Sequence, residues 1–173
     1  MKLADLAAKT GISLRLFRYV IDNEVVSREQ LAQTDTMGEG RGVRREFSEF
    51  SGFIVSLAAG MLAAGLTRQL TKTVLQVFFN WASGHMEFRH GPASSNFLVF
   101  CRARSILLEV ADATFMRVVV LPGVAGDSST TQLRSMEWTD IATGKPAPDG
   151  YTPMILVRLG LGWLAGTLCG SKE

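Results

Sequence analysis

Polar side chains suited to contacting DNA are grouped near the start of the chain. Arginine can hydrogen-bond guanine or phosphate, and the hydroxyl groups of serine and tyrosine can hydrogen-bond phosphate. On a helix, residues three and four positions apart are neighbours, so Arg15, Arg18 and Tyr19 fall on one side. The pattern predicts a recognition helix for double-stranded DNA, with four contact residues: Ser13, Arg15, Arg18 and Tyr19.

A second basic group lies in a glycine-rich stretch. Glycines alternate with polar residues over 34–42, which predicts a flexible hairpin tip, and a short strand is expected at 43–47. Glycine lets such a tip approach a phosphate chain closely, because it lacks a Cβ and accepts positive φ. We expect phosphate contacts from three arginines of this stretch: Arg41, Arg44 and Arg45.

The motifs of a phosphate-binding loop, a metal site and a catalytic triad are incomplete in this sequence. The glycine-rich stretch lacks the preceding apolar strand and the Gly-Lys-Ser/Thr of a phosphate-binding loop. His85, Glu87 and His90 could start a metal site, but the Pro-Cys-x-x-Cys of zinc deaminases is missing, so a polar linker is favoured. Cys101 and Cys169 have no zinc-type spacing, and no serine, histidine and acid suggest a triad. We therefore expect no enzyme activity, no cofactor and no metal.

The elements that hold the first basic group follow from caps and periodicity. A helix is expected over 3–10 with Gly11 ending it, and Ser13 is a suitable N-cap for a second helix that runs to about residue 22. One apolar stripe of this second helix should face inward: Leu14, Phe17 and Ile21. Two helices joined by a short glycine turn are typical of a helix-turn-helix.

Two further helices are expected at 49–64 and 67–82, with Ser48 before the first and Gly65 between them. The uncharged run 51–67 contains glycine and serine and is shorter than the roughly 20 apolar residues of a membrane span, so we expect no membrane contact. The apolar residues of these helices exceed what one small domain would bury, which predicts a homodimer. They are Phe53, Leu57, Met61, Leu70, Val74, Val77, Phe78, Phe79 and Trp81.

The rest of the chain predicts strands. Residues 83–96 contain glycine, proline and serine and read as a linker, which divides the chain into domains at 1–82 and 97–173. The second domain should be a small antiparallel β-rich accessory unit for dimerisation, ligand sensing or partner contact. Trp138 and Trp163 are expected in its core rather than in a ligand pocket. The expected fold class is α+β, with strands at 97–102, 106–110, 114–121, 135–141 and 154–159 and a terminal helix at 161–168.

A known family shares features of the first 80 residues. Residues 10–19, TGISLRLFRY, resemble the recognition helix of the MerR (mercury-resistance regulator) family of winged helix-turn-helix proteins, where tGvs-x-R-x-x-RyY is usual. Residues 40–48, GRGVRREFS, are similar to that family's wing. The resemblance is that of a divergent relative, since Val20 stands where the family has a second tyrosine. The resemblance implies a winged helix-turn-helix with Arg15, Arg18 and Tyr19 at the major groove of DNA. It also implies that Arg44 or Arg45 contacts the DNA backbone from the wing.

The predicted function is a sequence-specific, DNA-binding transcriptional regulator of MerR-like type, working in the cytoplasm with RNA polymerase or a small-molecule effector as further partners. The start of the chain has acidic Asp5 and no apolar run, so no signal peptide is expected. Two alternatives stay open. One is an excisionase-like architectural factor that bends DNA for a recombinase. The other is a protein-interaction adaptor, which the formal net charge of only +2 favours.

Overall fold

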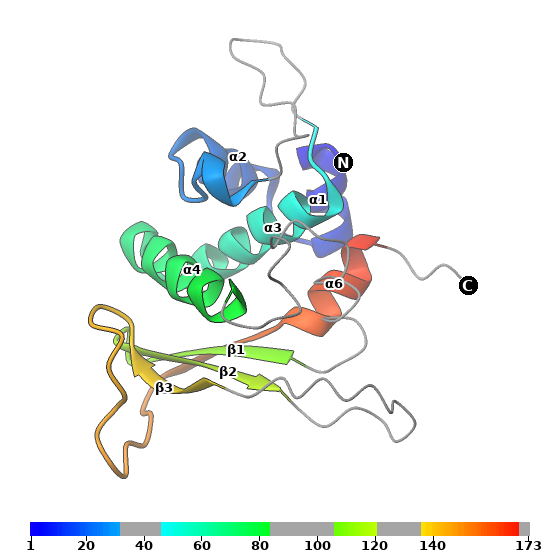
Figure 1. Cartoon of the computed structure of the whole chain (residues 1–173). Helices are drawn as coiled ribbons and strands as arrows, with labels where there is room; N and C mark the ends of the chain where they lie inside the picture. The colour runs from blue at the N-terminus through cyan, green and yellow to red at the C-terminus, as the bar shows by residue number, and fades with distance from the viewer. Residues whose placement is uncertain (32–45, 84–105, 121–135, 170–173) are drawn as a thin grey trace, which may run out of the picture.

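The elements form two layers, a group of helices and an antiparallel sheet, so the fold class is α+β (Figure 1). The computed structural model describes residues 1–31, 46–83, 106–120 and 136–169. The helices of this part are α1 (Leu3–Thr10), α2 (Leu14–Asp22), the 3-10 helix η1 (Arg28–Gln30), α3 (Glu49–Ala63), α4 (Arg68–Ser83) and α6 (Leu161–Cys169). The strands are β1 (Ile106–Ala111), β2 (Phe115–Val120), β3 (Met136–Asp140) and β4 (Leu156–Gly160).

The turn between α1 and α2 is built as the sequence predicts. Gly11 adopts a left-handed φ of 71°, and its N–H donates to the carbonyl of Ala7 at 3.0 Å, which ends α1. A residue with a Cβ would be strained at this φ. The hydroxyl of Ser13 accepts the N–H of Leu16 at 3.4 Å and so caps α2. Both predicted helix ranges are confirmed.

Helix α2 is held by one apolar side, which packs against α3. Phe17 and Val20 are completely buried and Ile21 is nearly so. The predicted stripe is therefore confirmed at Phe17 and Ile21, whereas Leu14 is only half-buried. Val20 joins the stripe because it lies three residues from Phe17 and faces the same way.

Helices α3 and α4 also begin and end where the sequence places them. The hydroxyl of Ser48 accepts the N–H of Ser51 at 3.1 Å, and Thr67 Oγ1 accepts the N–H of Leu70 at 3.2 Å. Gly65, with φ of 92°, makes the turn between them. Almost every residue of α3 is buried, since this helix packs against α1, α2, α4 and α6. In the described part of the chain, no helix is both long and apolar enough to cross a membrane.

The sheet has the strand order β3-β2-β1-β4 with every neighbouring pair antiparallel. A short turn joins β1 to β2, and Asp112 and Ala113 take positive φ there. Along β1, Ile106, Leu108 and Val110 are buried and face the helices, because side chains alternate between the two faces of a strand. Figure 1 shows α4 lying over this inner face.

The helices and the sheet share one hydrophobic core. Helix α6 follows β4 directly and packs against α1, α3 and β1, and Lys9 Nζ donates to the carbonyl of Leu168 at 2.6 Å. Buried residues from Leu6 to Leu168 belong to a single cluster. The predicted accessory domain, 97–173, therefore has no separate core among the described residues. The predicted linker from residue 84 onward and the predicted strand 97–102 lie outside those residues.

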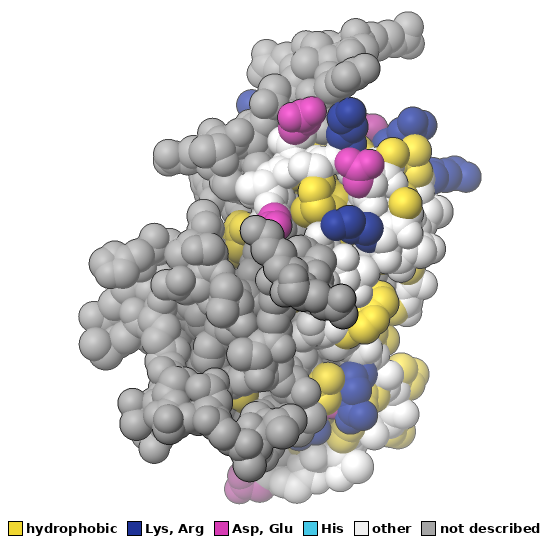
Figure 2. Space-filling view, turned by 90° about the vertical axis from the view of Figure 1, so that its right-hand side faces the viewer, with side chains coloured by type: hydrophobic (Ala, Val, Ile, Leu, Met, Phe, Trp, Pro, Cys, Tyr) yellow, Lys and Arg dark blue, Asp and Glu magenta, His cyan; other side chains and the backbone are white. Residues whose placement is uncertain are grey.

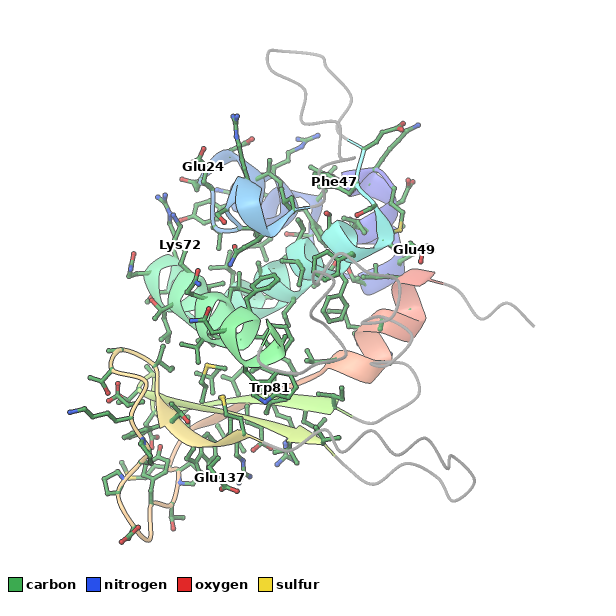
Figure 3. The ribbon with its side chains drawn as sticks, viewed as in Figure 1. Glu24, Phe47, Glu49, Lys72, Trp81 and Glu137 are labelled. Atoms are coloured by element: carbon green, nitrogen blue, oxygen red, sulfur yellow. The ribbon has the colours of Figure 1, made fainter. Side chains whose placement is uncertain are left out.

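The apolar surplus of α3 and α4 is covered by the chain itself. Phe78 and Phe79 are both buried, and Trp81 is half-buried on the side of α4 that faces the sheet (Figure 3). The sequence analysis placed these aromatics at a dimer interface because the apolar residues of the two helices exceed what one small domain would bury. The structure corrects that reason, since α4 is enclosed by α3 on one side and the sheet on another. The homodimer stays a prediction without this support.

A shared core predicts a single cooperative unfolding transition. Leu168→Ala empties a fully buried position of α6 and should lower the free energy of unfolding by about 2–5 kcal/mol. Urea denaturation followed by far-ultraviolet circular dichroism and by tryptophan fluorescence should give coincident curves that shift together. Thr167→Ala, half-buried on the same helix, is the control and should change the free energy by less than about 1 kcal/mol. Two separate transitions, with only one of them shifted, would contradict the shared core.

Candidate nucleic-acid interface

The side of α2 opposite its buried stripe presents the predicted contact residues together. Arg15 and Arg18 are exposed, and Tyr19 exposes 41% of its surface although it is a large aromatic residue. Neither guanidinium forms an ion pair within the described residues. An arginine with no partner keeps all its N–H donors available for an external acceptor. The structure thus brings Arg15, Arg18 and Tyr19 to one exposed face.

Ser13 lies at the start of this face but is already engaged. Its oxygen accepts the N–H of Leu16, so the hydroxyl serves first as the N-cap of α2. The hydroxyl proton is still free to donate, and the N-terminal end of a helix favours negative charge. Ser13 can therefore contact a phosphate without giving up its capping role.

The charge around α2 is mixed. Glu24 follows α2 and lies beside it, with a positive φ of 48° (Figure 3). Figure 2 shows the face on the right-hand side of Figure 1, away from α2, and there too basic side chains lie next to acidic ones. Attraction of a polyanion by α2 therefore depends on a few local arginines rather than on a broad basic surface. Arg41, Arg44 and Arg45, the second predicted group, lie outside the described residues.

The outer face of the sheet holds a charged row that sequence reasoning missed. Glu109 on β1 is 1% exposed, although it points away from the helical layer. Arg117 Nε on β2 donates to Glu109 Oε2 at 2.6 Å, and Arg158 Nε on β4 donates to Oε1 at 2.5 Å. The strand registers pair Glu109 with both arginines directly, so three neighbouring strands carry one ion-paired row.

The two arginines determine the ionisation of the carboxylate between them. Burial by itself raises the pKa of Glu109. The hydrogen bonds and positive charges of Arg117 and Arg158 outweigh this effect, so the pKa of Glu109 lies below its ordinary value. Glu109 is therefore ionised at neutral pH. This one side chain links β2 and β4, which lie on either side of β1.

An aromatic group continues the row toward β3. The β2–β3 pairing shifts register between Met116 and Val118, and the guanidinium of Arg117 lies 4.4 Å from the centre of the Trp138 ring. The extra residue lies on β3, and such a bulge re-aims the side chains of the strand that carries it. Tyr151 packs edge-on against Trp138, with the ring centres 5.7 Å apart. Trp138 is thus half-buried on the outer face instead of in the core, and Trp163, predicted as core, is 65% exposed.

Tyr151 ties the β3–β4 connection to the β1–β2 turn. Its hydroxyl donates to Asp112 Oδ2 at 2.6 Å, and the N–H of Ile155 donates to Oδ1 at 2.8 Å. Burial and the Asp112 carboxylate raise the pKa of Tyr151 to about 12, while the hydrogen bond from Tyr151 and those from backbone N–H groups lower the pKa of Asp112. Every polar group of this cluster has a partner in the fold, so it stabilises the sheet rather than forming a reactive site.

Two adjoining hollows of about 190 and 380 Å³ lie between the start of α4 and the β1–β2 turn. They share Thr67, Leu70 and Ala113, and their lining is mainly apolar. The carboxylate of Asp112 at the rim already accepts its hydrogen bonds from the fold. No group of three histidine, cysteine, aspartate or glutamate residues in the described ranges is placed to hold a metal ion.

No family model matches the chain, and no match was found among curated proteins or solved structures. The resemblance to MerR-type regulators therefore stays a prediction from residues 10–19 and 40–48.

The charged row predicts a stability change in acid. Because the pKa of Glu109 is lowered in the folded state, its ionised form stabilises the fold above the ordinary glutamate pKa, and this contribution is lost as the pH falls through the folded value. Glu109→Gln should lower the free energy of unfolding at neutral pH by about 1–3 kcal/mol. In urea titrations, the difference in unfolding free energy between wild type and variant should then narrow as the pH falls below the ordinary glutamate pKa of 4.5 and through the lower folded value. Glu137→Gln, at an exposed position on β3, is the control and should leave the pH profile unchanged; a constant gap for Glu109→Gln would contradict the assignment.

Proposed function

We propose that the chain is a sequence-specific, double-stranded DNA-binding transcriptional regulator in which α2 is the reading helix. One observation carries the proposal. Helix α2 is fixed by a buried apolar side and exposes Arg15 and Arg18, without ion pairs in the described residues, on its other side. A rigidly held helix with free arginines is what direct reading of base edges requires, because a bidentate contact to guanine needs a fixed approach.

The roles of the four residues follow from their positions on α2. The major groove admits an α-helix, and the N-terminal residues of a recognition helix reach the base edges. Arg15, the second residue of α2, is assigned to a base, with Arg18 beside it. Ser13 and Tyr19 are assigned to phosphates, since a hydroxyl there fixes the position of the helix without reading sequence.

The segment 40–48 is proposed as a wing, and its residues 40–45 lie outside the described part of the chain. Arg41, Arg44 and Arg45 would contact phosphates on the neighbouring backbone, and the resemblance to MerR-type proteins supports this role. The same resemblance, over about residues 1–80, supports a winged helix-turn-helix of a cytoplasmic regulator. RNA polymerase and a small-molecule effector are the further partners that such a regulator would use.

A protein-interaction adaptor is the second candidate. The mixed charge visible in Figure 2 and the net charge of +2 favour it, because they provide little long-range attraction for DNA. Failure of every duplex to bind at low salt would support the adaptor. An excisionase-like architectural factor would instead bind a duplex, bend it strongly and require a recombinase for its effect.

The reading role of α2 is tested on a binding site selected from random duplexes. Arg15→Ala should weaken binding to that site by about 1–3 kcal/mol and relax the preference at one base position. Lys145→Ala is the control, since Lys145 is exposed. It belongs to the connection between β3 and β4, which Figure 1 shows on the sheet side of the molecule, away from α2. Fluorescence anisotropy titrations give the affinities. Unchanged affinity and unchanged base preference for Arg15→Ala would rule out α2 as the reader.

The wing is tested by salt dependence. Each phosphate contact releases counterions, so Arg44→Ala combined with Arg45→Ala should lower the slope of log affinity against log salt by roughly one to two units. The double variant should weaken specific and random duplexes alike, because phosphate contacts carry no sequence information. Circular dichroism checks that the variant is folded. If a folded double variant keeps the wild-type slope, these arginines do not touch DNA.

A further inference from the structure

Strand β4 is an edge strand with unused backbone hydrogen-bonding groups. The N–H of Asp112 donates to the carbonyl of Ile155, which fixes the alternation along the pair: Val157 and Leu159 direct their backbone groups toward β1. Leu156, Arg158 and Gly160 direct theirs outward. Within the described part of the chain, no hydrogen bond to these outward groups is present. Such a row is a template for another strand.

Exposed apolar side chains gather along the same segment. Tyr19 aside, the large apolar residues that are exposed in the described ranges all fall within 154–163: Met154 at 92%, Ile155 at 69%, Leu156 at 40% and Trp163 at 65%. Trp163 lies beside Gly160, since a Cβ on Gly160 would be 3.7 Å from Trp163 Cβ. Apolar surface next to an unpaired strand edge is typical of a protein contact site.

We infer that this edge pairs with β4 of a second copy of the chain, antiparallel and with a two-fold axis at Val157. Charge excludes one alternative register. An axis at Arg158 would place two arginines opposite each other, and like charges in directly opposed positions are destabilising. With the axis at Val157, Leu156 lies opposite Arg158 of the second copy, whose guanidinium is already neutralised by Glu109 of its own chain.

The same register brings the exposed apolar side chains together. Met154 falls opposite Gly160 of the second copy, where no side chain blocks it and where Trp163 of that copy lies nearby. Methionine packs favourably against aromatic rings. Pairing of β4 with itself thus provides partners for its outward backbone groups, avoids opposed charges and brings apolar side chains together. It requires no other partner.

The geometry of the dimer fits the proposed function, on which this step rests. Two sheets joined edge to edge by antiparallel strands have their two-fold axis perpendicular to the sheet. Both helical layers then lie on the same side, because in each copy the helices cover one face only of the sheet (Figure 1). Both α2 helices therefore face one side of the dimer, and such a protein should prefer an inverted repeat.

The test is sedimentation equilibrium of the full chain without DNA, from about 1 to about 200 µM, so that the result is independent of the proposed function. A monomer–dimer equilibrium is expected. Leu156→Lys places a second cation opposite Arg158 of the other copy and should weaken association at least about tenfold. Gln76→Lys adds the same charge at an exposed position of α4 and should leave association unchanged. A monomer throughout, or a dimer insensitive to Leu156→Lys, would overturn the inference.

Cysteine cross-linking tests the register, with Cys101 and Cys169 replaced by serine. Val157 forms a non-hydrogen-bonded pair with itself across the axis, where Cα atoms are about 4.5 Å apart and a disulfide can close. Val157→Cys should give a disulfide-linked dimer on mild oxidation, whereas Leu159→Cys, two residues along β4, should not. Cross-linking of Leu159→Cys with none of Val157→Cys would rule out the proposed axis. DNA binding that persists in a strict monomer would leave the proposed function standing without this dimer.

Discussion

The burial of α3 is the constraint on which the rest of the fold depends. This helix has almost no exposed side, and an apolar helix of that kind is stable in water only when other elements surround it. Gly52 shows how closely they approach: a Cβ at that position would lie 3.1 Å from Leu6 Cδ2 of α1. The fixed position of α2, and so the direction of its arginines, follows from its packing against α3.

Local signals in the sequence were sufficient to locate the elements. Ser13, Ser48 and Gly11 act within one helical turn, and the chemistry of a cap does not depend on the remainder of the chain. The helix ranges and the strands at 106–110 and 154–159 were therefore predicted within one or two residues. The shared core was not, because nothing local in residues 161–168 shows that they pack against α1 and α3 rather than within a separate domain.

The exposed face of α2 was predictable for the same reason, since helical spacing alone places Arg15 beside Arg18. The ion-paired row on the sheet was not. Glu109, Arg117 and Arg158 meet only because three strands adopt one particular register, and a shift by a single residue would move each side chain to the other face. Alternating patterns reveal which residues share a face of one strand, but they do not reveal which strands become neighbours. The bulge beside Trp138 adds a further change of direction that no sequence pattern indicated.

The contact of α6 with α1 also affects how the chain is synthesised. Lys9 and Leu168 are 159 residues apart in the sequence, but their helices pack against each other beside the same core. A nascent chain that lacks residues 161–169 has already exposed α1 and α3 but has nothing to cover the side where α6 packs. Contacts of such long sequence separation also slow folding, because a long loop must close before they form. Until α6 has left the exit tunnel, the emerging helices keep this apolar side exposed, and such exposed apolar surface is prone to aggregation.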